Sequence, residues 1–126
     1  MLFDEHAALP GFAMTTVCEG GALGGFAYGV KQEAGWWPER ATAPAPSWLD
    51  GEELFYVYEL ALLPELRGRG LGRALLDDLL KKRPERFAVL ASRVEAPARR
   101  LYRRWGWRKV GEFDSGGIDL LALDLS

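Results

Sequence analysis

Apolar residues along the chain fall into runs with two different periods, one typical of strands and one typical of helices. Segments 12–18 and 23–30 have the composition of strands, and Glu19-Gly20-Gly21 between them predicts a hairpin, because glycine adopts a positive φ without strain. The run 54–62, LFYVYELAL, predicts a buried strand that ends before Pro64, since proline has no N–H for a sheet ladder. Three further strands are predicted at 86–92, 107–113 and 118–125.

Two segments carry a helical period. The first follows the glycine-rich stretch 67–72 and places on one face Leu71, Leu75, Leu76, Leu79 and Leu80. The second spans 97–105, with proline at its first position and Gly106 as its stop. Its apolar side chains share a face that we expect to be committed to the core: Ala98, Leu101, Tyr102 and Trp105. The predicted order, β-β-loop-β-α-β-α-β-β, indicates an α/β fold with a mixed sheet.

The segment 31–51 differs from its surroundings. It holds Pro38, Pro44 and Pro46 together with three tryptophans, and this density of proline argues against regular structure. A loop of this length inside a compact domain is uncommon and often functional.

Composition narrows the class of protein. The 126 residues are 48% hydrophobic and 27% charged, which fits one globular domain over residues 1–126. The lone cysteine, Cys18, excludes an intramolecular disulfide and a CxxC zinc site, and we expect it to be buried. The lone histidine, His6, argues against a histidine-based triad or metal centre, and we expect it to be exposed. Without an apolar run of about 20 residues or a basic leader, the expectation is a cytoplasmic protein with no metal and no membrane contact.

Basic residues are concentrated in one third of the chain. Residues 65–109 hold fourteen basic and five acidic side chains, whereas 1–64 hold two basic and nine acidic ones, and 110–126 hold four acids and no base. Such a concentration indicates either an anionic partner or solvated helix faces. Nucleic acid and a phosphorylated cofactor are the two candidate partners.

The stretch RGRGLG at 67–72, between a strand and a helix, is suited to binding phosphate. Its glycines let an anion approach the backbone, and the helix N-terminus presents unpaired N–H groups. It is neither a P-loop nor a dinucleotide fingerprint, because Gly72 is followed by Arg73 and Ala74. The alternative is a glycine-rich turn without a ligand.

Two motifs together resemble the GNAT superfamily of acetyl-CoA-dependent N-acetyltransferases. Arg67-x-x-Gly70-x-Gly72 is similar to the family signature Q/R-x-x-G-x-G/A. Ala98-x-x-Leu101-Tyr102-x-x-x-Gly106-Trp107 is similar to A-x-x-L-Y-x-x-x-G-F, with Trp in place of the usual Phe. The resemblance covers residues 12–126 and implies a GNAT-like mixed, mostly antiparallel sheet flanked by helices.

The same resemblance raises a question about the N-terminal part. Only eleven residues precede Phe12, so we expect the chain to lack most of the family's usual N-terminal strand and helices. That segment normally covers one face of the sheet. The expectation is therefore an exposed apolar face that a second subunit or a separate segment covers, and hence a homodimer.

The resemblance also implies site residues. The backbone of Leu60, Ala61 and Leu62 would pair with the pantetheine arm of acetyl-CoA. Tyr102 would be the general acid that reprotonates the leaving thiolate. Where family members often carry Asn, this chain has Glu95, which would repel phosphate and which we expect to cap the helix instead. The pyrophosphate would be cradled by the N–H groups of Arg67, Gly68, Arg69, Gly70, Leu71 and Gly72.

A reacting amine must be neutral, so a base assists the reaction. Glu59 is the best candidate, although it equally suits pairing with an arginine or binding substrate. Strand alternation places it with Val57 and Ala61, on the face opposite that of Tyr56, Tyr58 and Leu60. The Trp36-Trp37 pair and the acidic first half suggest a cationic or aromatic amine, unless the tryptophans only cover the core.

Three functions follow from these observations. The expected one is direct transfer of acetyl from acetyl-CoA to a primary amine of a small molecule or a peptide. The alternative is a CoA-binding module without catalysis. Binding of nucleic acid through the arginine-rich segment 97–105 is disfavoured, because the apolar face of that helix is assigned to the core.

Overall fold

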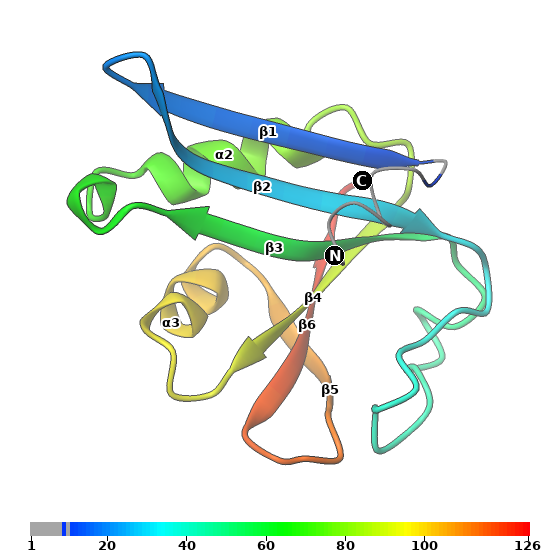
Figure 1. The fold of residues 1–126 in the computed structure, drawn as a ribbon. Helices are drawn as coiled ribbons and strands as arrows, with labels where there is room; N and C mark the ends of the chain where they lie inside the picture. Colours follow the sequence, from blue (N-terminus) through cyan, green and yellow to red (C-terminus); the bar gives the residue numbers. More distant parts are fainter. Residues whose placement is uncertain (1–8, 10) are drawn as a thin grey trace.

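A mixed six-stranded sheet organises the part of the chain that this computed structural model describes, residue 9 and residues 11–126 (Figure 1). The spatial order is β1-β2-β3-β4-β6-β5, and all neighbours are antiparallel except the parallel pair β3–β4. This confirms the predicted fold class, while His6 lies outside the described residues. The strands are β1 (Phe12–Glu19), β2 (Ala22–Gln32), β3 (Leu54–Leu62), β4 (Phe87–Arg93), β5 (Arg108–Glu112) and β6 (Ile118–Asp124).

Helices cover one face of this sheet. A 3-10 turn, η1 (Pro64–Leu66), leads from β3 to α2 (Leu71–Leu80), and α3 (Pro97–Arg104) connects β4 to β5. In Figure 1, α2 lies behind β1 and β2, and α3 lies beside the diverging ends of β3 and β4. The predicted apolar stripe of α2 is confirmed at four buried leucines, which belong to the larger of two core clusters: Leu75, Leu76, Leu79 and Leu80.

The opposite face is covered by the irregular segment between β2 and β3. Leu49 of that segment is only 1% exposed and lies in a second core cluster with Leu54, Phe87 and Leu120. Trp36 and Trp37 pack against the same cluster. These tryptophans therefore cover the core. The expected exposed apolar surface does not include Tyr28 and Tyr56 on this face, which are 1% and 7% exposed, and its cover by a second subunit stays a prediction.

The two halves of the sheet part at the parallel pair. β3 and β4 are in register only from Leu54↔Phe87 to Val57↔Leu90. β3 then continues to Leu62 and β4 to Arg93 without pairing to each other. Figure 1 shows the two strands diverging, and we call the opening between them the wedge.

A β-bulge in β3 changes which of its residues share a face of the sheet, so the prediction differs from the structure here. Tyr28 pairs with Glu59 but its neighbour Gly29 pairs with Val57, so Tyr58 is the extra residue. Directly opposed residues point to the same face, so Glu59 shares the face of Tyr28. Leu60 instead packs with Val57 in the helix-side cluster. The predicted strict alternation is wrong beyond Tyr58, because one extra residue reverses the facing of every residue that follows.

Cys18 was expected in the interior, and this prediction is wrong. Its side chain is exposed near the hairpin end of β1, where the register with β2 shifts between Val17 and Cys18.

No helix within the described residues has the length and apolar character needed to span a membrane.

Candidate active site

The glycine-rich turn places backbone N–H groups at the mouth of the wedge. Gly68 and Gly70 have φ values of 81° and 77°, which only glycine adopts without strain. Gly70 is the N-cap residue of α2, and no side chain caps this helix. The first N–H groups of α2, which include those of Leu71 and Gly72, therefore lack the side-chain acceptor that usually satisfies a helix start.

The arginines of this turn hold it in shape. The Arg67 Nε atom donates to the Leu62 carbonyl at 3.3 Å, and the Arg69 Nη2 atom donates to the Glu65 carbonyl at 3.4 Å. Both side chains are otherwise exposed. The hydrogen bonds of these two arginines stabilise the turn. Their guanidinium groups place positive charge beside the N–H groups at the start of α2.

The predicted pantetheine strand lies just beyond the point where β3 leaves β4. Leu60, Ala61 and Leu62 are half-buried and paired with β2 along one edge only. Their other edge faces the wedge. An extended ligand with amide groups fits such an open edge, because it can continue the ladder of backbone hydrogen bonds.

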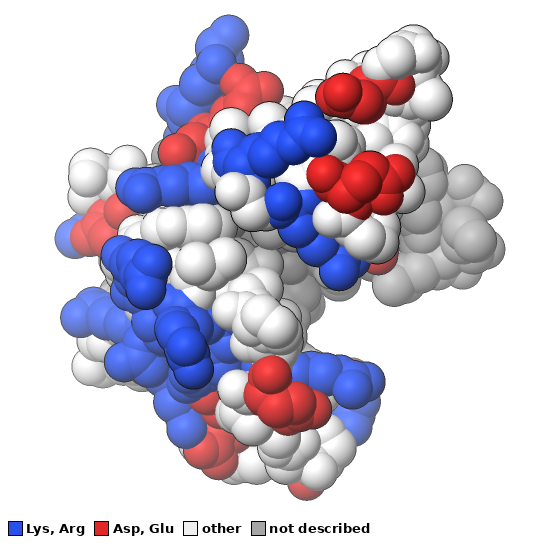
Figure 2. Space-filling view, turned by 90° about the vertical axis from the view of Figure 1, so that its left-hand side faces the viewer, with Lys and Arg blue, Asp and Glu red and all other residues white. Residues whose placement is uncertain are grey.

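Positive charge surrounds this side of the molecule. Figure 2 shows that Lys and Arg gather on the face at the left of Figure 1. On α3, Arg100, Arg103 and Arg104 are exposed, and no described acid pairs with them. The electrostatic potential here favours a polyanion such as a phosphorylated cofactor.

Tyr102 lies at the base of the wedge. It is 8% exposed and belongs to the same buried cluster as Val57 and Leu90, the last pair that joins β3 to β4. Its ring packs near Trp105 and Trp107, at centroid distances of 5.8 and 6.0 Å. Burial raises the pKa of the Tyr102 hydroxyl above its ordinary value. The phenol therefore stays protonated at neutral pH.

Glu59 lies on the opposite face of the sheet from Tyr102. Its carboxylate is exposed, and its strand partner is Tyr28. Burial, followed by the charge of Glu59, raises the pKa of Tyr28. The neighbouring Tyr58 stacks on Tyr28 at 6.0 Å, and its hydroxyl accepts a hydrogen bond from Gln32 at 3.3 Å. The structure thus places the two predicted catalytic side chains, Tyr102 and Glu59, on opposite faces of the sheet.

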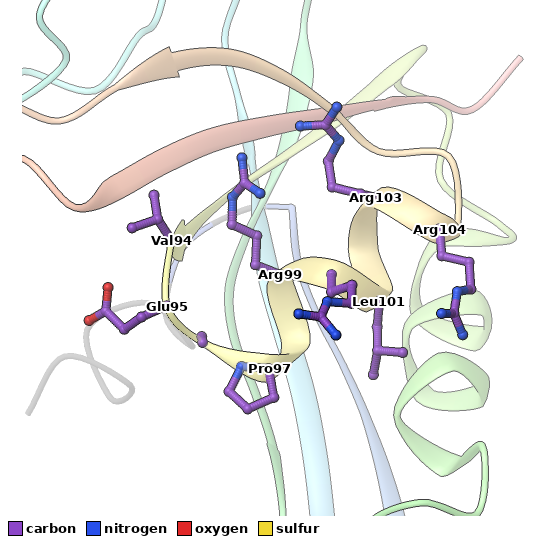
Figure 3. Close-up of a pocket in the computed structure, with 9 residues that line it drawn as sticks. Val94, Glu95, Pro97, Arg99, Leu101, Arg103 and Arg104 are labelled. Carbon is purple, nitrogen blue, oxygen red and sulfur yellow. The ribbon is translucent and has the colours of Figure 1, made fainter.

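Two expectations about α3 are wrong. Glu95 does not cap the helix, because the N-cap residue is Ala96 and no side chain bonds there. Leu101 does not join the core but is 40% exposed. Figure 3 shows Leu101 and Arg104 on the side of α3 that faces α2, whereas Arg99 reaches toward β6. α3 packs on the core through the buried Tyr102, with Ala98 and Trp105 partly buried beside it.

Sequence reasoning missed two buried acids, Glu85, which pairs with Arg83, and Asp119. Asp119 on β6 is 3% exposed and is bound by Arg99 and Lys109. Twenty residues separate Arg99 from Asp119 in the chain. The alternation of β6 gave no signal for this pairing, because an acid between apolar residues is equally typical of a solvent-facing position.

Comparison with known proteins identifies related folds. Residues 14–109 match the model of the Acetyltransferase (GNAT) domain family. No curated protein sequence is significantly similar to this chain.

Among solved structures, a putative GNAT-family acetyltransferase from Desulfovibrio desulfuricans has a TM-score of 0.69 and 23% identity, over 99% of this chain and 77% of that one. NAA60 of Arabidopsis thaliana, solved with acetyl-CoA, has a TM-score of 0.68 and 20% identity, over 98% of this chain and 82% of that one. The ribosomal-protein-S18-alanine N-acetyltransferase of Escherichia coli has a TM-score of 0.64 and 20% identity, over 99% and 76%.

Proposed function

Because this chain belongs to the GNAT acetyltransferase family, we propose that it transfers the acetyl group of acetyl-CoA to a primary amine. The observation that carries the proposal is the wedge between β3 and β4, which has an uncapped helix start at its mouth and a buried tyrosine at its base. An extended anionic thioester fits this combination. The acceptor is a small molecule or a peptide.

Three features of the chain support binding of acetyl-CoA. The open edge of Leu60–Leu62 offers backbone groups to the amides of the pantetheine arm. The Arg67 N–H already donates to the Pro64 carbonyl at 3.2 Å, whereas the N–H groups from Gly68 to Gly72, at the uncapped start of α2, suit a pyrophosphate. A Cβ atom added at Gly68 or Gly70 would meet nothing within 4 Å, so the space beside the turn is open.

Acetyl-CoA supplies the acetyl group as a thioester. In the proposed reaction, Glu59 accepts a proton from the amine, directly or through water, as the nitrogen bonds to the acetyl carbon. Tyr102 donates its hydroxyl proton to the sulfur as the carbon–sulfur bond breaks. A thiol has a pKa near 8.5, so proton donation assists its departure at neutral pH. The positions of the two side chains on opposite faces suit these two separate transfers.

The test begins with binding and continues with turnover. Calorimetry at moderate salt should show binding of CoA and of acetyl-CoA, and absence of binding would overturn the proposal. Release of free thiol from acetyl-CoA should then be followed with a panel of amines: small amines, aminoglycosides, amino acids, peptide N-termini and lysine peptides.

Two variants separate catalysis from binding alone. Tyr102→Phe should retain CoA binding and lower kcat by about 10²–10⁴-fold, the usual contribution of a general acid. Glu59→Gln should also retain CoA binding and lower kcat, because glutamine cannot accept the proton that the attacking nitrogen loses. The exposed Glu19→Gln serves as a control without effect. If the unmodified protein binds CoA but turns over none of the amines, the chain is a CoA-binding module instead.

A further inference from the structure

We infer that Asp119 is a positioning residue that acts through Arg99 to fix the orientation of α3 and thereby the place of the Tyr102 hydroxyl. The inference rests on the proposed function, because it concerns the geometry of the proposed acid. It adds to the site a residue on β6, a strand that carries none of the residues proposed above to bind acetyl-CoA or transfer a proton.

The contact itself is a buried ion pair. The Asp119 side chain is 5% exposed, and its Oδ2 atom accepts from the Arg99 Nε atom at 3.0 Å and also from the Arg99 Nη2 atom. The Lys109 Nζ atom lies 3.4 Å from its other oxygen, Oδ1. Charge-assisted bonds of this kind are directional, so the guanidinium cannot turn without losing them. Figure 3 shows the Arg99 side chain extending from α3 toward β6.

The position of this ion pair in the fold allows it to control the orientation of α3. Beyond Val57↔Leu90, β4 is no longer held by β3, and its last residues are held by β6 alone, where Ser92 pairs with Asp119. The chain then turns directly into α3. Asp119 therefore ties the first turn of α3 to the only strand that still anchors this end of β4.

The other contacts that fix the rotation of α3 are apolar. It has eight residues, no side-chain cap and one buried residue, Tyr102, with Ala98 and Trp105 partly buried against the same cluster. Such apolar contacts are less directional than the hydrogen bonds of Arg99. Arg99 precedes Tyr102 by three positions, so their side chains project about 60° apart around the helix axis. Any rotation that follows loss of the Arg99 tie moves the tyrosine too. A displacement of about 1 Å at a reacting group can cost about 10²-fold in rate.

The alternative is that the pair only stabilises the fold, and a double-mutant cycle distinguishes the two. Asp119→Asn keeps an acceptor for Arg99 but removes the charge. We expect it to lower kcat by about 10–100-fold while KM for acetyl-CoA changes little. In a Tyr102→Phe background the same change should have almost no further effect, because the group it positions is absent. The assay is thiol release with the amine of the panel that reacts fastest.

A matched control removes an exposed carboxylate in the same way. Asp114→Asn disrupts the exposed pair with Arg40 and should leave kcat unchanged in both backgrounds. If Asp119→Asn does not fold, Arg99→Gln breaks the same tie from its more exposed partner and completes the same cycle.

The outcomes are distinct. Equal effects of Asp119→Asn in the two backgrounds, with Tyr102→Phe itself impaired, overturn this inference and leave the proposed function standing. Full activity of Tyr102→Phe overturns the acid role and this inference together. An effect that disappears in the Tyr102→Phe background supports the positioning role.

Discussion

At the scale of single residues, the two candidate groups for proton transfer differ mainly in solvation. Tyr102 is buried among Trp105 and Trp107, whereas Glu59 is exposed on the other face. Burial raises the pKa of a phenol and so preserves its proton. Burial therefore keeps on Tyr102 the proton that its proposed role needs.

The raised pKa predicts the alkaline limit of the reaction. The acid works only while protonated, so activity is lost as pH rises through its pKa, which burial moves above 10.0. We expect kcat to show no decline from loss of this proton below about pH 10, and Tyr102→Phe to lack the decline altogether. Measurement of kcat from neutral pH upward checks this. A decline that persists in the phenylalanine variant would contradict the assignment.

A second residue-scale prediction concerns the close approach at the bulge. A Cβ atom at Gly29 would lie 2.5 Å from the Phe55 ring and 2.6 Å from the Tyr56 carbonyl oxygen. Gly29→Ala should therefore lower the free energy of unfolding by about 1–3 kcal/mol. Gly72→Ala is the matched control, since its Cβ would meet only Leu62 at 3.6 Å. Urea denaturation should show the control to be as stable as the parent or more so, because alanine favours helix.

At the scale of elements, the segment between β2 and β3 behaves as core in spite of its irregular backbone. It lies over the sheet face opposite the helices and contributes the deeply buried Leu49. Trp48 of the same segment lies against Phe87, with Arg108 3.9 Å above its ring. An irregular segment fills the position where a helix or a second layer would otherwise cover the sheet.

This segment can be tested by truncating its anchor. Leu49→Ala should lower the free energy of unfolding by about 2–5 kcal/mol, as for other buried leucines. Leu101→Ala, at a leucine that is 40% exposed, should change it by less than about 1 kcal/mol. Urea denaturation compares the two. Equal, small effects would show that the segment is only loosely attached.

The elements also show what a single sequence reveals. The helix α2 could be predicted from the sequence because its leucines repeat at helical spacing. The four leucines that face the core are all buried. The glycine-rich turn could be predicted from the sequence, because a positive φ, as at Gly68 and Gly70, is adopted without strain mainly by glycine. The bulge at Tyr58 could not be predicted, since a bulge requires neither a tyrosine nor a glutamate at these positions. The exposure of Leu101 depends on how α3 meets the sheet, which no local pattern encodes.

At the scale of the whole molecule, basic charge lies on the elements beside the wedge. The basic segment 65–109 carries α2, β4 and α3, while the acidic segments 1–64 and 110–126 carry β1, β2, β3 and β6. A polyanionic ligand is therefore attracted toward the wedge from a distance, and this attraction weakens as salt screens it.

Calorimetry with CoA at low and high salt measures that contribution. We expect a weaker Kd at higher ionic strength. Arg104→Gln should weaken binding further by about two- to fivefold, as for one exposed charge. Arg40→Gln removes a basic residue from the acidic first half and should change Kd less. A Kd that is independent of both salt and Arg104 would contradict the electrostatic role.

Association of two copies remains a prediction. Leu23 and Leu63 are 54% and 45% exposed and line a shared apolar groove where β2 begins and β3 ends. Sedimentation equilibrium should give twice the chain mass of 14.0 kDa. A mass of one chain at every concentration tested would contradict the prediction.

The wedge has one more consequence, for mechanics. Among the residues that the structure describes, four pairs of neighbouring strand residues join the two halves of the sheet, Leu54–Val57 with Phe87–Leu90. A ligand lying between β3 and α3 touches both halves and so acts as a brace across a narrow joint. Its binding should slow amide hydrogen exchange in β1 and β2 as well as in β5 and β6, far from any atom it contacts, because opening the joint would first require its release.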